Sequence, residues 1–498
     1  MPTPSHSKSW MRGVAANAAA PSSVLLRLLT ESGLPAWKVL CEERALPADV
    51  VEAILMHPDR PVRAYFARNR YADPAQRGRL VHDRDNGVRY ALAVGPRHRP
   101  GRATALPDQV LKVLLAARDE DEPDPAPLLT ADEIKQELTT SGQISQSFRR
   151  SMATHENPAI RAQATWQWSW FTPAQRAAFL ADPAPEVRDA ARQAARFLDP
   201  QETKAQLPER DGHFRTHLLL NCAVSSEVAE QCLAERRDLQ SLAHNSYTPS
   251  DIVARLARDP DAAVRERVAA RIDLTSELLA QLAADEDPTV RTRARIHPFP
   301  RTEPERDLID CLIGHTAEQV GQLSEWYLQP EPDWFAACAI SAHPLLRRIA
   351  ATFPDLPEHL VHQLAHDPDE HTRRLLAYNH PLAPPALLLE AFIAATDQRS
   401  LLLALPHMPR TGLAHLQDYE DPEVRALAAG DISLKRPPLD QLSDPDPWVR
   451  KAAARNRLLP ADTIDALLED AELAEAAASN PRLTPEHLHR LLDQAGVA

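Results

Sequence analysis

The sequence predicts an all-α fold, an α-solenoid in which about 15 repeats, each a pair of short helices, stack along the chain. Two observations predict this fold. A Val-Arg step, preceded by Asp-Pro and followed by alanine and a leucine-rich stretch, returns at regular intervals. In addition, the 498-residue chain has only 13 glycines but 45 prolines. Few glycines argue against a sheet with tight turns, whereas many prolines suit short helices that begin with proline.

The Val-Arg step marks the repeats. Neighbouring steps lie roughly 24 to 28 residues apart, and the larger gaps are close to multiples of this period. The steps are Val62-Arg63, Val88-Arg89, Ile160-Arg161, Val187-Arg188, Val264-Arg265, Val290-Arg291, Leu346-Arg347, Thr372-Arg373, Val424-Arg425 and Val449-Arg450. This periodicity covers most of the chain and indicates one repeated structural unit.

The first helix of each repeat is expected to begin near its Asp-Pro. An aspartate accepts main-chain N–H groups as an N-cap, and proline suits the first helical position. The spacer before the Val-Arg step is longer after Asp259-Pro260 than after Asp287-Pro288, so we expect a helix start of variable length. The helix is expected to end near an asparagine or a proline, as at Asn69 and His297-Pro298.

The second helix of each repeat is leucine-rich, and "LTPEHLHRLL" near the end of the chain is an example. Thr484 is the expected N-cap and Pro485 the first helical residue, while Leu488, Leu491 and Leu492 form one apolar stripe. A single helix pair cannot bury such a stripe. Stacked pairs can, because their stripes then merge into a continuous core.

An acidic, proline-rich segment interrupts the array between Ala117 and Glu133. We expect an N-terminal repeat array at 1–117, a linker or exposed loop at 118–130 and the main repeat array at 131–498. Residues 134–150 look helical but match no repeat well. The sequence therefore predicts two arrays that are separated by the acidic segment.

Three segments resemble the leucine-rich repeat variant family, a bacterial relative of HEAT-like repeats: "DPDAAVRERVAARIDLTSELLAQLAAD", "DPDPWVRKAAARNRLLPADTIDALLED" and "NPRLTPEHLHRLL". The resemblance covers most of the chain. It implies paired short helices, one of them often a 3₁₀ helix, stacked in a right-handed superhelix, with protein interaction as the general role. The founding type carries an N-terminal cysteine cluster for an iron–sulfur centre, but here Cys41 stands alone in the first hundred residues. We therefore expect no such cluster and no other cofactor.

Charge and cysteine content narrow the function classes. The net charge of −14 disfavours a protein that binds nucleic acid over most of its surface, because such proteins are normally basic. Five cysteines without a C-x-x-C pair fit a reducing compartment. No apolar run approaches the ~20 residues that cross a bilayer. We therefore expect a cytoplasmic protein without membrane association, and the oligomeric state stays open.

The recurring arginine allows two interpretations. A row of guanidinium groups could bind a phosphate backbone or an acidic peptide. Alternatively, each arginine pairs with an aspartate of its own or the adjacent repeat and ties the repeats together. We favour the second interpretation because aspartate recurs with arginine in most repeats. The predicted structural ladder comprises Asp259, Arg265, Asp287, Arg291, Asp367, Arg373, Asp421, Arg425, Asp444 and Arg450.

Two other segments are candidate partner-binding sites. The stretch from Arg60 to Arg102 holds many arginines and few acids, so it could steer acidic ligands, or it could be an ordinary solvated face. The tryptophans of "TWQWSWF" could anchor a partner, or they could fill an irregular junction. The candidate residues in these two segments are Arg63, Arg68, Arg70, Arg89, Trp166, Trp168 and Trp170.

His359, His362 and His366 share one helix face, which is the arrangement that metal binding would need. Leu360 and Leu364 form the opposite, core-facing stripe, so we expect these histidines to face water and to bind no metal. The chain also has no G-x-S-x-G, P-loop, G-x-G-x-x-G or H-E-x-x-H motif. We therefore expect no enzyme activity.

The sequence favours a non-enzymatic repeat scaffold that binds a protein or peptide on its concave surface. The alternative is a HEAT-like nucleic-acid-binding protein, including the base-excision type, that uses an arginine-rich face. A regulatory or immunity partner of another protein is a variant of the first hypothesis, and the sequence does not separate the two.

Overall fold

The computed structural model describes residues 4–96, 105–118, 129–196, 198–271, 273–295, 332–341, 344–395 and 399–497. Within these residues the chain forms α-helices and 3₁₀ helices joined by turns, without a β-strand. The predicted all-α fold of short packed helices is therefore confirmed. No helix in this part of the chain is long and apolar enough to span a membrane. The right-handed path of the superhelix stays a prediction.

The chain folds into two compact units. Unit 1 comprises Met1–Ser145 and Leu376–Ala498, so both ends of the chain belong to it, and unit 2 comprises Gln146–Leu375. The boundary expected at 118–130 does not coincide with this division, because the residues on both sides of that segment belong to unit 1. Residues 119–128 of the segment lie outside the described residues.

Unit 1 contains helices from both ends of the chain. Its N-terminal part holds α1 (Pro4–Ala16), α2 (Ser22–Arg27), η1 (Glu31–Ala36), α3 (Trp37–Glu42), α4 (Ala48–Leu55), α5 (Arg60–Ala67), α6 (Pro74–Gly78), η2 (Arg79–His82), α7 (Asn86–Val94), α8 (Asp108–Ala116) and α9 (Ala131–Thr140). Its C-terminal part holds α28 (Pro385–Ala394), α29 (Arg399–Leu403), η5 (Ala414–Leu416), α30 (Pro422–Ala429), η6 (Asp440–Ser443), α31 (Pro447–Ala454), α32 (Ala461–Leu468), α33 (Ala474–Ala478) and α34 (Pro485–Gln494).

Unit 2 is one continuous stretch of chain. It holds α10 (Gln146–Met152), α11 (Pro158–Gln163), η4 (Ala164–Trp170), α12 (Pro173–Leu180), α13 (Pro185–Arg196), α14 (Pro200–Gln206), α15 (His213–Asn221), α16 (Ser226–Glu235), α17 (Leu239–His244), α18 (Ser250–Leu256), α19 (Ala262–Ala269), α20 (Ser276–Ala283), α21 (Pro288–Arg295), α24 (Pro332–Ala339), α25 (Pro344–Ala351) and α26 (Glu358–Ala365). Helix α27 (Glu370–Asn379) contains the boundary to unit 1.

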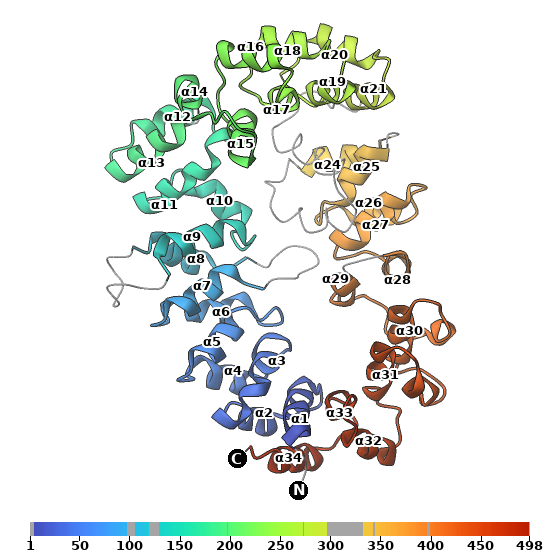
Figure 1. Ribbon diagram of the computed structural model, residues 1–498. Helices are drawn as coiled ribbons and strands as arrows, with labels where there is room; N and C mark the ends of the chain where they lie inside the picture. The colour runs from blue at the N-terminus through green and yellow to red at the C-terminus, as the bar shows by residue number, and fades with distance from the viewer. Residues whose placement is uncertain are drawn as a thin grey trace. The chain divides into compact units, whose positions relative to one another are not determined.

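Successive helices alternate between two rows. Figure 1 shows this for unit 2, where α16, α18 and α20 form one row and α17, α19 and α21 form the other. In the second row α17 packs against α19, and α19 packs against α21. One core cluster runs through both rows and includes the fully buried Ala243, Val268 and Ala269. Small side chains at these positions let the helices approach closely, and the stacked pairs then exclude water from each other's leucines.

In several Val-Arg helices, a capping residue stands four positions before the arginine. The Asp261 carboxylate accepts a bond from Ala263 N at 2.9 Å, and the Asp287 carboxylate accepts one from Thr289 N at 2.8 Å. The expected variable helix start is therefore wrong, because Arg265 and Arg291 follow their caps by the same interval. The first aspartate of "DPDAAVR" is not the cap, because the helix begins after Asp261. The carboxylate of Asp259 instead binds Arg236 and accepts the N–H of Asp261.

Other predicted helix starts agree with the structure. Thr484 caps α34, and Pro485 is its first residue. Helix α9, whose sequence matches no repeat well, nevertheless packs against α7, and α7 in turn packs against α5. It begins with a capping box formed by Thr130 and Glu133. Packing position therefore identifies α9 as part of the array where the sequence motif does not.

A buried asparagine near the end of several first helices ties each of these repeats to the one before it. Asn480 Nδ2 donates to the main-chain oxygens of Ala454 and Asn456 at 2.9 and 3.0 Å. Asn456 makes the same pair of bonds one repeat earlier, to the oxygens of Ala429 and Asp431. Corresponding pairs are made by Asn69 and Asn245. These bonds satisfy carbonyl groups that the helix end leaves open.

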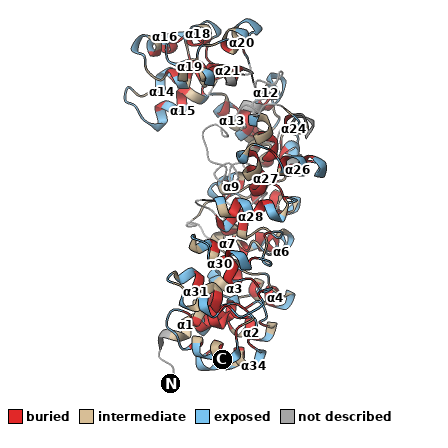
Figure 2. Cartoon of the chain, turned by 90° about the vertical axis from the view of Figure 1, so that its right-hand side faces the viewer, coloured by how far each residue is buried: buried red, intermediate tan, exposed pale blue. Residues whose placement is uncertain are grey.

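The two ends of the chain stack on each other within unit 1. Helix α1 packs against α33, and Figure 1 places both termini together. Asn17 Nδ2 donates to the main-chain oxygens of Ala478 and Asn480 at 3.1 and 2.8 Å, which repeats the pattern of the other asparagines. The indole Nε1 of Trp10 donates to Leu468 O at 2.9 Å. Figure 2 shows buried residues on the packed helices α1 and α3.

A glycine permits this close contact between the chain ends. A Cβ atom at Gly13 would lie 2.5 Å from the Cβ of Ala478 and would also overlap Glu475 O. Beside it, Arg27 Nη2 donates to Asp493 Oδ1 at 2.5 Å and to the main-chain oxygen of Val497. The first repeat therefore takes the position that a further repeat after the last one would take.

Candidate functional site

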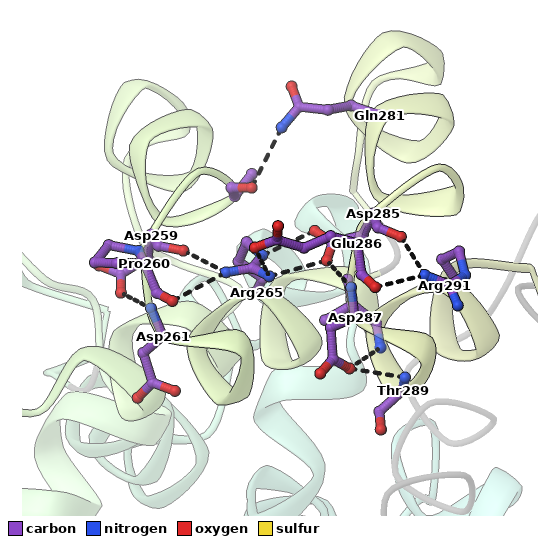
Figure 3. Close-up of polar contacts among 12 residues, drawn as sticks. Asp259, Pro260, Asp261, Arg265, Gln281, Asp285, Glu286, Asp287, Thr289 and Arg291 are labelled. Atoms are coloured by element: carbon purple, nitrogen blue, oxygen red, sulfur yellow. Dashed lines mark hydrogen bonds and ion pairs between the residues drawn. The ribbon is translucent and has the colours of Figure 1, made fainter.

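The arginine of each Val-Arg step was the first candidate for a ligand site, and Figure 3 shows its surroundings in unit 2. Arg265 Nε and Nη2 donate to the two carboxylate oxygens of Asp285 at 2.8 and 2.9 Å. Arg265 Nη1 donates to the main-chain oxygen of Asp259 at 2.7 Å. Arg265 and Asp285 have side chains that are only 8% and 10% exposed. We call this pair, an arginine and the aspartate of the next repeat, an arginine clip.

The same clip recurs along the chain with the same atoms. In each case the Nε and Nη2 groups bind one carboxylate, and Nη1 binds a main-chain oxygen six residues before the arginine. These clips are Arg63–Asp83, Arg161–Asp182, Arg347–Asp367 and Arg425–Asp444. Related pairs are Arg215–Asp238, Arg399–Asp421 and Arg450–Glu472. A planar guanidinium suits such two-point binding.

Two acidic positions in the repeat have different roles. Asp285 binds the clip arginine Arg265, whereas Asp287, two residues later, caps α21. Arg291 donates to the main-chain oxygens of Asp285 and Glu286. Among the other ladder residues, Asp259 binds Arg236, Arg373 donates to the main-chain oxygen of Asp367, and Asp421 both caps α30 and binds Arg399.

The clips also shift the acid–base properties of their members. The hydrogen bond from Arg265 lowers the pKa of Asp285, and the same bond raises the pKa of Arg265. Burial opposes each of these shifts. Because the guanidinium already has a carboxylate and two main-chain acceptors, it has few donors left for a ligand.

Three arginines of the stretch from Arg60 to Arg102 lie near acids from other repeats. Arg63 is in a clip, Arg68 lies 3.7 Å from Glu42, and Arg79 lies 2.5 Å from Glu52. Arg70 donates to the hydroxyl of Tyr71, with its guanidinium 5.0 Å from that ring. Arg89 donates to Asp83 O and lines an apolar pocket of about 400 Å³ with His82, Val113 and Ile134. Arg97, Arg99 and Arg102 lie outside the described residues.

The three histidines lie on one exposed face of α26 and at its end. His359, His362 and His366 are exposed, while Leu360 and Leu364 are buried, as the sequence predicts. The ring centroids of His362 and His366 lie 4.9 Å apart, and His366 Nδ1 bonds to His362 O at 2.9 Å. In the described part of the chain, no group of three His, Cys, Asp or Glu residues is placed to hold a metal ion.

The tryptophans of η4 have different surroundings. Trp168 is 6% exposed and packs edge-on against Phe171 and Phe179, so it belongs to a local core. Trp166 is 36% exposed, and the guanidinium carbon of Arg149 lies 4.9 Å from the centroid of its ring. The side chain of Trp170 lies outside the described residues.

Trp448 is an exposed aromatic residue that the repeat pattern did not single out. Trp448, near the start of α31, is 66% exposed, and Lys451 Nζ lies 5.8 Å from the centroid of its ring. Its sequence signal is a tryptophan two residues before Arg450, a position at which none of the other Val-Arg steps has an aromatic ring of this size. A comparison with known protein families found no match for this chain, and a comparison with curated proteins found none either.

Proposed function

We propose that the protein is a non-enzymatic repeat scaffold that binds a protein partner through exposed aromatic side chains. Trp448 carries this proposal, because 66% of a large apolar side chain faces solvent on a helix of the regular array. Tryptophan is favoured at interface hot spots, since it contributes a large contact area with little loss of side-chain entropy. Lys451 adds a cation beside the ring, which suits a partner with acidic groups.

The proposal favours a protein partner over the alternative of nucleic acid. The nucleic-acid hypothesis depends on arginines with donors available for phosphate. Arg63, Arg161, Arg265, Arg347 and Arg425 instead bind carboxylates and main-chain oxygens. The net charge of −14 would also repel a polyanion.

We further propose that the repeats are of the leucine-rich repeat variant type and that the protein works in the cytoplasm. The short helix pairs and their 3₁₀ helices support the first point. Cys41, Cys222 and Cys232 are buried free thiols, which supports a reducing compartment. Cys311 lies outside the described residues.

Site-specific photo-crosslinking tests the partner class. A benzophenone side chain at position 448, in the full-length protein at native expression, is expected to give a discrete protein adduct. The matched control is the same group at Met56, which is 82% exposed but lies in the turn that ends α4. An adduct with nucleic acid, or no enrichment over position 56, would contradict the proposal. With the partner identified, W448A is expected to weaken binding about tenfold or more, while M56A leaves it unchanged.

A further inference from the structure

Arg149 is a buried cation whose surroundings differ from those of every clip arginine. It lies on α10, is 6% exposed and rests on the ring of Trp166, which belongs to η4 of the following repeat. Among the residues that the structure describes, no side-chain or main-chain oxygen accepts a hydrogen bond from its guanidinium, and no carboxylate lies within ion-pair distance.

Within the described residues, Arg149 lacks the hydrogen-bond and ion-pair partners that Arg265 has. Arg265 is similarly buried, at 7% exposed, but it binds a carboxylate and two main-chain oxygens. The bond to Asp285 raises the pKa of Arg265, whereas burial lowers the pKa of Arg149. A buried guanidinium without a counter-ion destabilises a folded protein, because desolvation is not compensated by an opposite charge. In the part of the chain that the structure describes, Arg149 therefore lacks the anion that Arg265 has.

Two further side chains of η4 have buried donor atoms. Gln167 Nε2 and Trp168 Nε1 are buried and have no hydrogen-bond partner among the described residues. Gln167 also departs from helical geometry, with φ −90° and ψ 16°. Buried donors are normally paired, so a segment with several open donors favours a ligand that carries acceptor oxygens.

We propose that Arg149 and Trp166 form a carboxylate-binding site that receives an acidic side chain of a protein partner. The guanidinium would bind the carboxylate at two points, and the half-exposed ring of Trp166 would cover the apolar stem of the same side chain. A single buried cation beside an aromatic ring fits one carboxylate better than a row of phosphates, which would need several cations. The inference rests on the proposed function, because it assigns the chemistry of a protein partner.

Fluorescence anisotropy with a labelled peptide of ten glutamates tests this site in the full-length protein. The wild-type protein is expected to bind it more tightly than a peptide of ten glutamines. Arg149→Met is expected to weaken the binding about tenfold or more, since it removes a charge-assisted bidentate contact. Arg150→Met is the matched control, because Arg150 is exposed on the same helix and carries the same charge. Equal weakening by both variants, no binding by the wild-type protein, or tighter binding of single-stranded DNA of ten nucleotides would overturn the proposal.

Thermal unfolding separates a ligand site from a structural role. If Arg149 lacks its anion, Arg149→Met should leave Tm unchanged or raise it, and a lower Tm would overturn the proposal. The crosslinks from position 448 report the proposed function independently. If they persist while Arg149→Met has no effect on peptide binding, only the carboxylate site fails. If they are absent while Arg149→Met still weakens peptide binding, the proposed scaffold function fails instead.

Discussion

The junction between the two chain ends can be compared with a junction between repeats that follow each other in sequence. At the ordinary junction, Asn480 bonds to two main-chain oxygens of the preceding repeat. At the chain-end junction, Asn17 makes the same two bonds to the last repeat, across more than 460 residues of sequence. The two junctions differ in their additional contacts. Arginine clips hold ordinary junctions, whereas Trp10 and Arg27 hold the chain ends.

This difference shows that stacking does not depend on a covalent link between neighbours. Side-chain bonds to main-chain oxygens define how one repeat sits on the next, and Gly13 provides the close approach that α1 and α33 need. An open repeat array exposes an apolar face at each end and needs capping repeats. In unit 1 the first and last repeats cover each other, so each removes the exposed face of the other.

Acid is expected to have the largest effect, because it acts on several clips together and not on the asparagine bonds. Hydrogen bonds from arginine lower the pKa of Asp182, Asp285 and Asp444. A carboxylate with a lowered folded pKa stabilises the fold above its unfolded pKa of about 3.9 and loses this effect as the pH falls through the folded pKa. The urea midpoint should therefore be steady above about pH 5 and fall below about pH 4. A fall centred near pH 6 would instead indicate histidine.

Gly13→Leu is expected to have the largest effect of the single substitutions. The new side chain would overlap Ala478 and Glu475, so α1 and α33 would have to separate. Overpacking of this kind costs about 3 kcal/mol. Urea unfolding measures the loss, and hydrogen exchange should show it first in α1 and α33. Gly430→Ala is the control, because its nearest neighbour would lie at 3.5 Å. Equal losses in the two variants would contradict a close chain-end contact.

Asn17→Ala and Asn480→Ala compare the two junctions directly. Each removes two hydrogen bonds and leaves buried main-chain oxygens without a partner, so each should cost about 2 kcal/mol in the free energy of unfolding. Equilibrium unfolding in urea measures both losses. If Asn17→Ala is close to neutral while Asn480→Ala destabilises, the chain ends do not form an equivalent junction.

Asp287→Ala is expected to have the smallest effect, about 1 kcal/mol, because it removes a helix cap. Asp285→Ala, two residues away, should cost about 2 kcal/mol, because it leaves the buried guanidinium of Arg265 without its carboxylate. The difference in unfolding free energy between the two variants measures the separate roles of the two acids. Equal values would show that the clip adds nothing beyond a cap.

Several features were predictable from the sequence because they are local. The period of the Val-Arg step predicted the helix pairs, and Thr484 with Pro485 predicted the start of α34. The alternation of His359, His362 and His366 with buried leucines predicted their exposure. The sequence did not separate Asp259 from Asp261 as the cap, since both are aspartates before the same helix. Their roles depend on Arg236, which lies 23 residues before Asp259.

The chemistry of the candidate site depended on contacts that sequence patterns do not carry. Trp166 was one of three neighbouring tryptophans, and only packing distinguishes it from Trp168, which joins a phenylalanine cluster. Arg149 belonged to a segment that matches no repeat well. Its burial beside Trp166, with no carboxylate within ion-pair distance among the described residues, follows from how α10 and η4 meet.

The sequence by itself determined the helical repeat, because capping, helix periodicity and the leucine stripe act between residues that are close along the chain. The tertiary structure decided which acid binds each arginine. It also decided that the first repeat packs on the last one. Those contacts join main-chain oxygens and carboxylates from different repeats. A main-chain oxygen is the same in every residue, so only the stacking of the helices selects the one that Asn17 or Arg265 reaches.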